Sequence, residues 1–377
     1  MPAVRNVLVV GAGAAGAATA ILLAEGGVSV DLIDIKPDAR AAGSGITLQG
    51  NALRVLQQLG VWDPVREHGY AFDTLGLRAP DPHGSLIVEL TDVRTGGPDL
   101  PATVGMSRPD LTRILLDRAA AAGAKVRFGT TYTGIHQDTT GVDVTFADAS
   151  TGRYDLVVGA DGIRSWTRRA LGIHLETRST GMGIWRAFTA RPATVTRTDL
   201  YYGGPCHIAG YCPTGEDSLY AYLVEDAQDR STLAPQESLT VMRRLSEAYH
   251  GPWDDIRAVL TDPATVNYTW FESHVLPAPW HRGRVVLIGD AAHTCPPTLA
   301  QGAAQALEDA AVLAELLLDG DGALTDGLLQ AFSERRYERA SAVVDGSLQL
   351  AQWLLDHERG DVPGLMARIS HLVSEPA

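Results

Sequence analysis

Apolar and polar residues follow two different patterns along this chain. NVLVV (6–10) and VSVDLID (28–34) are short apolar runs rich in β-branched residues, which is typical of buried parallel strands. DLVVGA (155–160) and RVVLI (284–288) have the same character, and residues 17–25 between the first two runs have a helical pattern. These runs predict a Rossmann-like α/β unit built on a parallel sheet.

The middle of the chain follows the second pattern. Alternating runs such as SLYAYLV (218–224) and VNYTWFES (266–273) are separated by turn-like stretches, which indicates an antiparallel sheet. A shorter piece at 72–89 has the same character, and residues 322–372 have the pattern of helices. We therefore predict an α/β fold that carries an inserted antiparallel (α+β) layer and ends in C-terminal helices.

Composition narrows the classes of partner. The chain has 377 residues and a net charge of −14, which argues against nucleic acid and against an anionic membrane surface, because both attract Lys and Arg. Its three cysteines form no CxxC pair, and no Cys/His set has zinc spacing, so we expect no metal. A reduced, cytoplasmic protein is the expected setting.

The apolar N-terminus allows a competing interpretation. Residues 7–24 carry no charge and follow Arg5, as in a signal peptide or a short membrane span. The glycines within this stretch, however, are spaced as in a nucleotide-binding loop, and a second strand follows at the right distance. We therefore expect no membrane segment.

The sequence GAGAAG gives Gly11, Gly13 and Gly16 the GxGxxG spacing. Gly11 permits the sharp turn from strand to helix, Gly13 lets a pyrophosphate approach the backbone, and Gly16 lets helix and strand pack closely. Asp34, 18 residues after Gly16, can accept hydrogen bonds from a ribose and would repel a 2′-phosphate. The unit thus predicts FAD or NAD rather than NADP, although Lys36 is a contrary sign, and the motif alone does not choose between the two.

Two later motifs follow strands of the same kind. Asp161 lies in YDLVVGADGIRS (154–165) and Asp290 in GDAAHTCPPTLAQGAAQALEDA (289–310). Ligands bind at the carboxyl edge of such sheets, although Asp161 could also be a turn residue or a helix cap. In the second motif a double proline stiffens the loop, and a helix follows whose first turn has only small residues. A flat ligand could therefore reach its amides, which would stabilise negative charge by roughly 0.3–1 kcal/mol.

In this order and spacing, the three motifs resemble those of the class A flavoprotein aromatic hydroxylases, which are FAD-dependent monooxygenases with the p-hydroxybenzoate hydroxylase fold. The resemblance covers nearly the whole chain and is greatest to salicylate and 6-hydroxynicotinate hydroxylase-like members. It implies FAD as cofactor, NADH or NADPH as transient reductant, and hydroxylation of a small aromatic or N-heteroaromatic substrate with O2 through a flavin C4a-hydroperoxide. It also implies an FAD-binding domain at 1–71, 100–179 and 272–321, a substrate-binding domain at 72–99 and 180–271, and a helical segment at 322–377.

The resemblance further implies residue roles. Asp34 would hold the ribose of FAD, Asp161 would serve both FAD and NAD(P)H, and the loop AAGSGITL (41–48) would be the path along which the flavin moves. The family often has Glu at the position of Asp34 and Gly at that of Ala300. The expected cofactor-binding residues are Gly11, Gly13, Ala15, Gly16, Asp34, Gly45, Arg108, Tyr132, Asp161, Asp290, Pro297, Gly302 and Ala303.

Hydroxylation also needs a base, because deprotonating a ring hydroxyl raises its electron density. In the predicted strand CHIAGYC, His207 and Tyr211 share one face and could form a proton relay, or they could simply face solvent. His293 is expected to be structural. The expected substrate-pocket residues are Trp185, Tyr220, Tyr222 and Pro297, although tryptophan and tyrosine are also common in sheet cores.

Other functions remain open at this point. A flavin dehydrogenase, reductase or oxidase could use the same fold, and a non-catalytic flavin-binding protein is a further alternative. A flavin-dependent halogenase would need a WxWxIP motif, which this sequence lacks. The chain is expected to be a monomer or a homodimer, and the sequence does not identify the substrate or separate NADH from NADPH.

Overall fold

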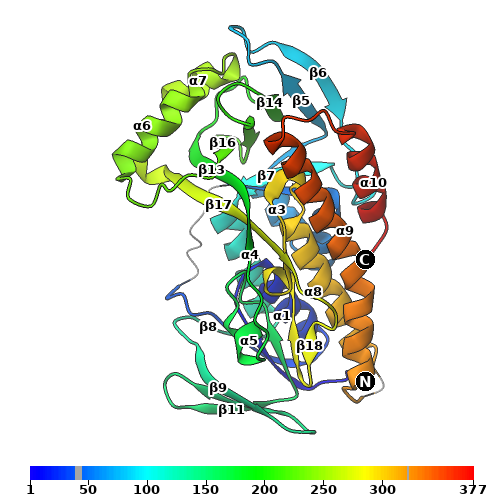
Figure 1. The fold of residues 1–377 in the computed structure, drawn as a ribbon. Helices are drawn as coiled ribbons and strands as arrows, with labels where there is room; N and C mark the ends of the chain where they lie inside the picture. The colour runs from blue at the N-terminus through cyan, green and yellow to red at the C-terminus, as the bar shows by residue number, and fades with distance from the viewer. Residues whose placement is uncertain (39–44, 321) are drawn as a thin grey trace.

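The computed structural model describes residues 1–38, 45–320 and 322–377. Two sheets lie one above the other and a long helix runs beside both (Figure 1). The lower sheet has six strands in the order β18-β19-β12-β1-β2-β8, all parallel except β18 at one edge. Its strands are β1 (Asn6–Val10), β2 (Ser29–Ile33), β8 (Lys125–Arg127), β12 (Leu156–Gly159), β18 (His281–Arg282) and β19 (Val285–Leu287).

Helices and two small sheets surround this parallel sheet. Helix α1 is almost wholly buried because its small and apolar residues pack against α4 and α8. The helices of this part are α1 (Ala14–Glu25), α2 (Gly50–Gln58), α3 (Trp62–His68), α4 (Arg108–Ala121), α5 (Trp166–Ala170) and α8 (Gly302–Leu318). The small sheets comprise β3 (Gly45–Gln49), β4 (Tyr70–Phe72) and β7 (Thr103–Ser107), and β9 (Tyr132–Gln137), β10 (Val142–Phe146) and β11 (Thr151–Tyr154).

The upper sheet has eight strands in the order β20-β17-β13-β16-β15-β14-β5-β6. All neighbours are antiparallel except β14 and β5, which run parallel. Its strands are β5 (Thr74–Arg78), β6 (Leu86–Thr91), β13 (Arg178–Ala190), β14 (Thr198–Tyr202), β15 (Ile208–Pro213), β16 (Ser218–Asp226), β17 (Val266–Val275) and β20 (His293–Thr294).

The two faces of the upper sheet have different neighbours. Helices α6 (Pro235–Ser246) and α7 (Pro252–Val259) cover the side that we call the outer face (Figure 1). The other side, the inner face, is directed toward β3 and the end of α9 (Asp326–Leu355). Short 3-10 turns at Pro263–Thr265, Gly289–Ala291 and Pro297–Leu299, and the helix α10 (Val362–Ser374), complete the described elements.

Buried charges attach α9 to the lower sheet's helices. Arg336 is fully buried, and its guanidinium lies 3.1 Å from Glu308 and 2.7 Å from Asp309, both on α8. Removing one partner of such a group leaves a buried charge without compensation, at a cost of about 3–5 kcal/mol. The long helix is therefore an integral support for α8 rather than an appendage.

The predicted fold class is confirmed, including the inserted antiparallel sheet and the C-terminal helices. Residues 72–99 and 180–271 both contribute strands to the upper sheet, but helices α6 and α7 within the second segment were not predicted. The exact domain boundaries remain a prediction. In the ranges that the structure describes, no helix is both long and apolar enough to cross a membrane.

Candidate cofactor and substrate site

Three motif loops meet at one edge of the parallel sheet. Strands β1, β12 and β19 are direct neighbours, so the loops that follow them start side by side. Gly11 has a φ of +103°, and a Cβ at this position would lie 2.3 Å from the carbonyl oxygen of Ala160. Only glycine fits here, because the first loop packs directly on the loop that carries Asp161.

The start of α1 leaves space where a pyrophosphate would lie. A Cβ on Gly16 would lie 1.9 Å from the oxygen of Gly11, whereas one on Gly13 would meet nothing within 4 Å. No side chain caps α1, so its first amides are free to bind an anion. Ala15 is buried beside Gly289 of the third loop. This arrangement agrees with the separate roles expected for the glycines.

Asp34 ends the second strand beside this loop. Its carboxylate accepts hydrogen bonds from the amides of Ala12, at 2.9 Å, and Lys36, at 2.8 Å. It therefore fixes the first loop from the side on which the ribose is expected. Of the predicted flavin path 41–48, residues 41–44 lie outside the described residues, and Gly45 begins β3.

The carboxylate of Asp161 is occupied by its own loop. It accepts from the amide and hydroxyl of Thr167, at 2.8 and 2.9 Å, and from Ser165, so it also caps the start of α5. The hydroxyl of Tyr132 donates to Thr167 at 3.2 Å from a buried position, and burial raises its pKa. The prediction that the Tyr132 side chain contacts the cofactor is therefore corrected: it supports the Asp161 loop from the core side.

Arg168 connects the second and third loops. Its guanidinium is buried and donates to the carbonyl oxygens of Ile163 and Ala291, both at 2.8 Å. This residue was missed in the sequence, where WTRRA gives two adjacent arginines and no indication of which one turns inward.

The third loop is held by Asp309 of α8. Its carboxylate accepts from the amide of Gly289 at 2.8 Å and lies 2.7 Å from Nε2 of His293. Burial alone would raise the pKa of Asp309, but His293 and Arg336 lower it to about 2. The charged carboxylate thus fixes the turn that presents Asp290, and His293 has the structural position expected for it.

Arg108 and Asp290 face the space between α4, the third loop and the inner face of the upper sheet, which we call the cleft. Both side chains are accessible to solvent, yet burial by the surrounding protein lowers the pKa of Arg108 and raises that of Asp290. The charges of Asp290 and Arg186 both affect the pKa of Arg108, so the three groups lie close together. Arg108 also donates through Nε to the carbonyl of Gly45, 3.2 Å away, which ties α4 to the start of β3.

The first turn of α8, like that of α1, has free backbone amides. Gln301 precedes it without capping it, because its side-chain amide donates to Asn51 at 3.2 Å and to Gln49. A Cβ on Gly302 would have only the sulfur of Cys295 near it, at 4.0 Å. Pro297 is exposed, and Ala303 is half-buried. These residues fit FAD: the uncapped start of α1 would hold its pyrophosphate, and the uncapped start of α8 would hold the polar edge of its ring.

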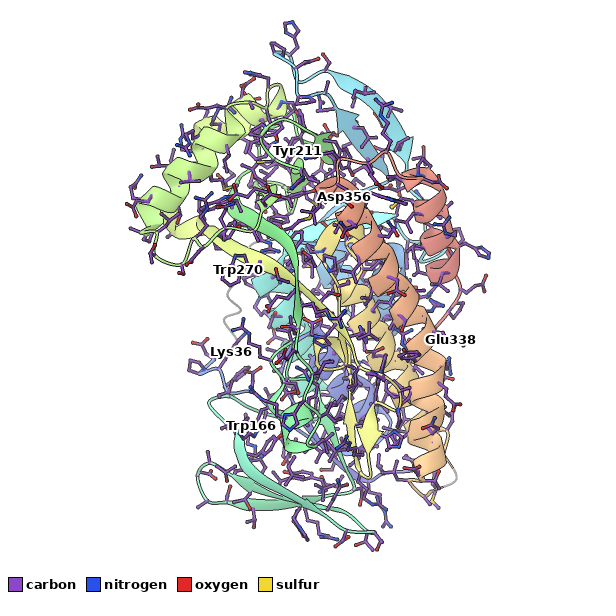
Figure 2. All side chains as sticks on the ribbon, viewed as in Figure 1. Lys36, Trp166, Tyr211, Trp270, Glu338 and Asp356 are labelled. Carbon is purple, nitrogen blue, oxygen red and sulfur yellow. The ribbon has the colours of Figure 1, made fainter. Side chains whose placement is uncertain are left out.

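The strand alternation of the upper sheet overturns two predicted roles. Trp185 and Tyr211 lie on the outer face, where both are buried under α6 and α7. Trp185 donates to Glu225 at 2.9 Å, and Tyr211 donates to Asp199 at 2.7 Å. Figure 2 shows Tyr211 in the upper layer, well separated from Trp166 beside the parallel sheet. The predictions that Trp185 contacts the substrate and that Tyr211 is catalytic are therefore wrong.

His207 has a different partner from the one predicted. Its Nε2 lies 2.9 Å from a carboxylate oxygen of the exposed Asp226, and its ring centre lies 5.8 Å from that of His357 after α9. The residue precedes β15 instead of continuing its outer face. The predicted relay between His207 and Tyr211 is therefore not formed.

Tyr220 and Tyr222 lie on the inner face, as a substrate pocket requires. Their ring centres are 5.1 Å apart, and a Cβ on Gly45 would lie 2.4 Å from Tyr220. Burial raises the pKa of Tyr222 well above its usual value, although its side chain is still partly accessible. Both tyrosines therefore border the cleft, and their role as substrate contacts stays a prediction.

Arg186 is a second residue that the sequence did not reveal. It follows Trp185 in β13 and so points to the inner face, where its Nε donates to the hydroxyl of Tyr220 at 3.0 Å. It also donates to Thr269, and its charge further lowers the pKa of Arg108. The signal was present in the sequence, because strand alternation puts Arg186 opposite to a tryptophan that is buried in the core.

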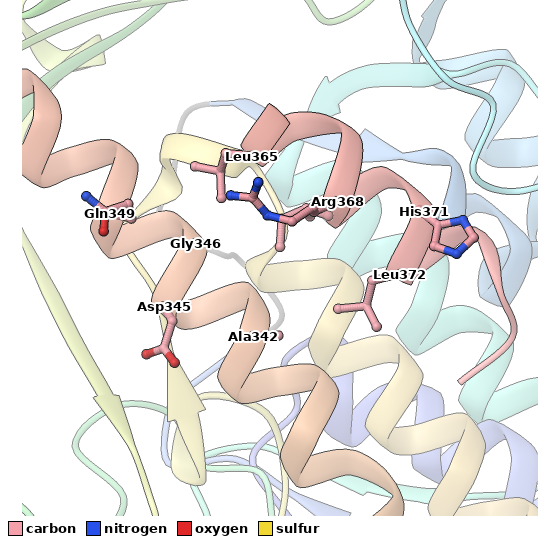
Figure 3. Close-up of a pocket in the computed structure, with 9 residues that line it drawn as sticks. Ala342, Asp345, Gly346, Gln349, Leu365, Arg368, His371 and Leu372 are labelled. Carbon is pink, nitrogen blue, oxygen red and sulfur yellow. The ribbon is translucent and has the colours of Figure 1, made fainter. Parts of the chain in front are cut away.

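A surface groove elsewhere contains none of these residues. It lies between α9 and α10, has a volume of about 510 Å³, and is lined by residues such as Asp345, Leu365 and Arg368 (Figure 3). Of the described residues, no group of His, Cys, Asp and Glu could hold a metal ion. The three cysteines are free thiols.

Comparison with known proteins supports the cofactor assignment. The sequence profile of the FAD binding domain family matches residues 5–347. The 2-heptyl-3-hydroxy-4(1H)-quinolone synthase of Pseudomonas aeruginosa PAO1 is 31% identical over 92% of this chain and 90% of its own. The 3-amino-4-hydroxybenzoate 2-monooxygenase of Streptomyces cremeus is 30% identical over 92% and 87%.

Solved structures agree in fold. The 2-methyl-3-hydroxypyridine-5-carboxylic acid oxygenase superposes with a TM-score of 0.78 at 25% identity, over 97% of this chain and 96% of its own. Klebsiella pneumoniae HpxO, solved with FAD and uric acid, gives 0.82 at 22% identity, over 98% and 93%. The chain therefore belongs to the FAD-binding domain family, as an FAD-dependent monooxygenase of the flavoprotein aromatic hydroxylase class.

Proposed function

We propose that this enzyme uses NADH or NADPH and O2 to hydroxylate an aromatic or N-heteroaromatic molecule that carries an acidic ring hydroxyl. The observation that supports this most is the position of Arg186. Its guanidinium, paired with the Tyr220 hydroxyl, faces Arg108 and Gly45 across the cleft. Bound FAD would supply the reducing and oxygen-activating chemistry, and the protein residues position and polarise the substrate.

Arg186 takes the place of the base predicted in β15. A guanidinium beside a phenol favours the phenolate, because an opposite charge nearby lowers the pKa of the acid. The tyrosine hydroxyl fixes the direction of the guanidinium and can donate to the same substrate oxygen. Ionisation of the ring hydroxyl raises the electron density of the ring, as oxygen transfer to an arene requires.

The inner face also excludes water from the ring. Phe72, Cys212 and Tyr220 form an apolar cluster against which Tyr222 packs. Across the cleft, the free amides of α8 can stabilise negative charge on the flavin's polar edge. An apolar cluster beside the guanidinium of Arg186 suits a planar, weakly acidic ring.

The names of relatives support the same substrate class. Those already described act on a quinolone and an aminohydroxybenzoate by name, and a 6-hydroxynicotinate 3-monooxygenase of Bordetella bronchiseptica is 28% identical over 94% of this chain. Each name describes a hydroxylated or oxo-substituted aromatic ring. We infer that the ring bound here belongs to this group.

The test is turnover under labelled oxygen. Purified holoenzyme is mixed with NADH or NADPH and a panel of phenols, hydroxypyridines and hydroxyquinolines, and the products are analysed by mass spectrometry. The proposal expects one labelled oxygen in the product. Nicotinamide oxidation that proceeds equally without oxygen, with no product, would instead identify a reductase. The predicted cytoplasmic location and the monomeric or dimeric state are separate proposals, the latter tested by light scattering.

A further inference from the structure

The strand register of the upper sheet aligns one row of side chains on its inner face. The row begins at Arg186 beside the cleft and ends on the edge strand β6. Each member is the direct cross-strand neighbour of the next. Its members are Arg186, Tyr222, Gly210, Leu200, Leu77 and Val88. A residue row of this kind forms a continuous strip, because opposite side chains lie within contact distance.

The outer part of this strip is apolar. From Gly210 outward it carries Leu200, Leu77 and Val88, and the next row adds Leu75 opposite Leu90. Side chains of Val88 and Leu90 are 38% and 43% exposed. Apolar side chains gathered on an accessible surface mark a binding site more often than single exposed ones do.

Charged residues of the same strands lie on the opposite face. Arg78 lies 2.5 Å from Asp199, and Arg197 lies 2.9 Å from Glu89, both as ion pairs. On β14 and β5 these charged side chains therefore lie on the outer face, and the leucines of the strip lie on the inner face. On β6, Leu86 and Ile87 are also exposed, but they lie outside the strip.

The inner part of the strip packs against α9. Leu200 and Tyr222 belong to the same apolar cluster as Leu354 and Leu355 at the end of α9. The ring of Tyr222 covers Gly210, since a Cβ there would lie 2.6 Å from that ring. Neighbouring strands are roughly 4.8 Å apart, so Leu77 lies about 10 Å from Gly210.

From this geometry we propose that the substrate is amphipathic: a hydroxylated aromatic ring held at Arg186, with an unbranched alkyl tail that crosses the ring of Tyr222 and follows Leu200 and Leu77 toward Val88. The proposal rests on the proposed function, because the ring must lie in the cofactor cleft for its tail to reach the strip. The strip would then select substrates by the length of their alkyl tail. Arg186 would select them by the acidity of the ring hydroxyl.

Binding without turnover tests this. Oxidised holoenzyme is titrated with 4-alkylphenols from 4-ethyl to 4-dodecylphenol, and the change in flavin absorbance gives each Kd. The proposal expects Kd to fall up to about fourfold for each added methylene until the tail passes Leu77. A Kd that does not change with tail length would overturn it.

Two substitutions of an aliphatic residue by glutamine distinguish an effect of the strip from an effect of any exposed apolar residue. Leu77→Gln should remove most of the tail dependence while leaving the Kd of 4-ethylphenol within about twofold. Ile87→Gln, on the neighbouring strand but outside the two rows, should leave the whole series unchanged. Equal effects of the two substitutions would refute the strip. If L77Q fails to retain FAD, the more exposed Val88→Gln takes its place, read on the longest tails.

The remaining outcomes are distinguishable. If light scattering shows a dimer that V88Q dissociates, and Kd is independent of tail length, the strip is an interface between two copies and the tail proposal fails. Tail-dependent binding with no labelled product would instead refute the proposed hydroxylation and leave the strip as a binding site.

Discussion

The cofactor edge and the substrate sheet position their functional groups in different ways. At the edge, backbone geometry sets the site: Gly11 and Gly16 have no room for a side chain, and the first amides of α1 and α8 have no side-chain cap. On the substrate sheet, the backbone is ordinary and the site depends on which side chains alternate to the inner face. A sequence motif can therefore identify the cofactor edge. The substrate site can be identified only by knowing which residues of each strand point to the inner face, which we call the strand phase.

The largest expected effect contrasts two glycines of the first loop. Gly11→Ala should lower the free energy of unfolding by about 3 kcal/mol and abolish FAD binding, because φ is +103° and the new methyl group would overlap the Ala160 carbonyl. Gly13→Ala should leave apoprotein stability nearly unchanged and weaken only FAD binding, since its space is open. Urea unfolding of the apoproteins and FAD titration measure both, and equal destabilisation would contradict the backbone argument.

Acid should loosen the junction between the Asp161 loop and the substrate sheet, where His274 of β17 lies 3.5 Å from Arg168. Burial and the neighbouring Arg168 lower the pKa of His274 to about 4. A histidine kept neutral in the fold stabilises it at pH values above the unfolded pKa of about 6.5 and loses that contribution as pH falls through 4. The expected loss between these values approaches 3 kcal/mol.

The measurement is urea unfolding from pH 7 to pH 4, followed separately by flavin release and by tryptophan fluorescence. His274→Gln should make the free energy of unfolding less dependent on pH above pH 4. His136→Gln, a change at an exposed histidine, should leave that dependence as in the wild type. A variant of His274 with the wild-type profile would show that another group titrates in this range.

Arg186 tests whether strand phase has identified the reactive side of the substrate sheet. Arg186→Gln should lower kcat/KM for the aromatic substrate by roughly 10- to 150-fold, as expected when a charged hydrogen bond is lost. Arg186→Lys should restore part of the activity and shift the pH profile less. Arg230→Gln is the matched control, because Arg230 pairs with Glu225 beside Trp185 on the outer face. Equal losses in R186Q and R230Q would remove Arg186 from the proposed mechanism.

The contrast between the cofactor edge and the substrate sheet also explains how much of the structure the sequence could predict. The GxGxxG turn, Asp161 and Asp290 were predictable because each follows a buried parallel strand, and such strands end at one edge. Trp185 was assigned to the pocket and Tyr211 to a catalytic relay because aromatic residues suit both a core and a ligand site. Helices α6 and α7 cover the outer face of the upper sheet, and they were not predicted. Without them, the outer face was taken for the substrate side, although it is part of the core.

The smallest expected effects concern the two residues of the relay that the structure does not form. Tyr211→Phe should cost about 1 kcal/mol of unfolding free energy, because it removes a buried hydrogen bond to Asp199. His207→Ala should change the free energy by about 0.5 kcal/mol or less, since Asp226 is exposed. Neither change should alter the ratio of hydroxylated product to NAD(P)H consumed. Uncoupling in H207A, seen as hydrogen peroxide in place of product, would mean that the segment before β15 closes onto the substrate during turnover. It would return His207 to the reaction while leaving Tyr211 in the core.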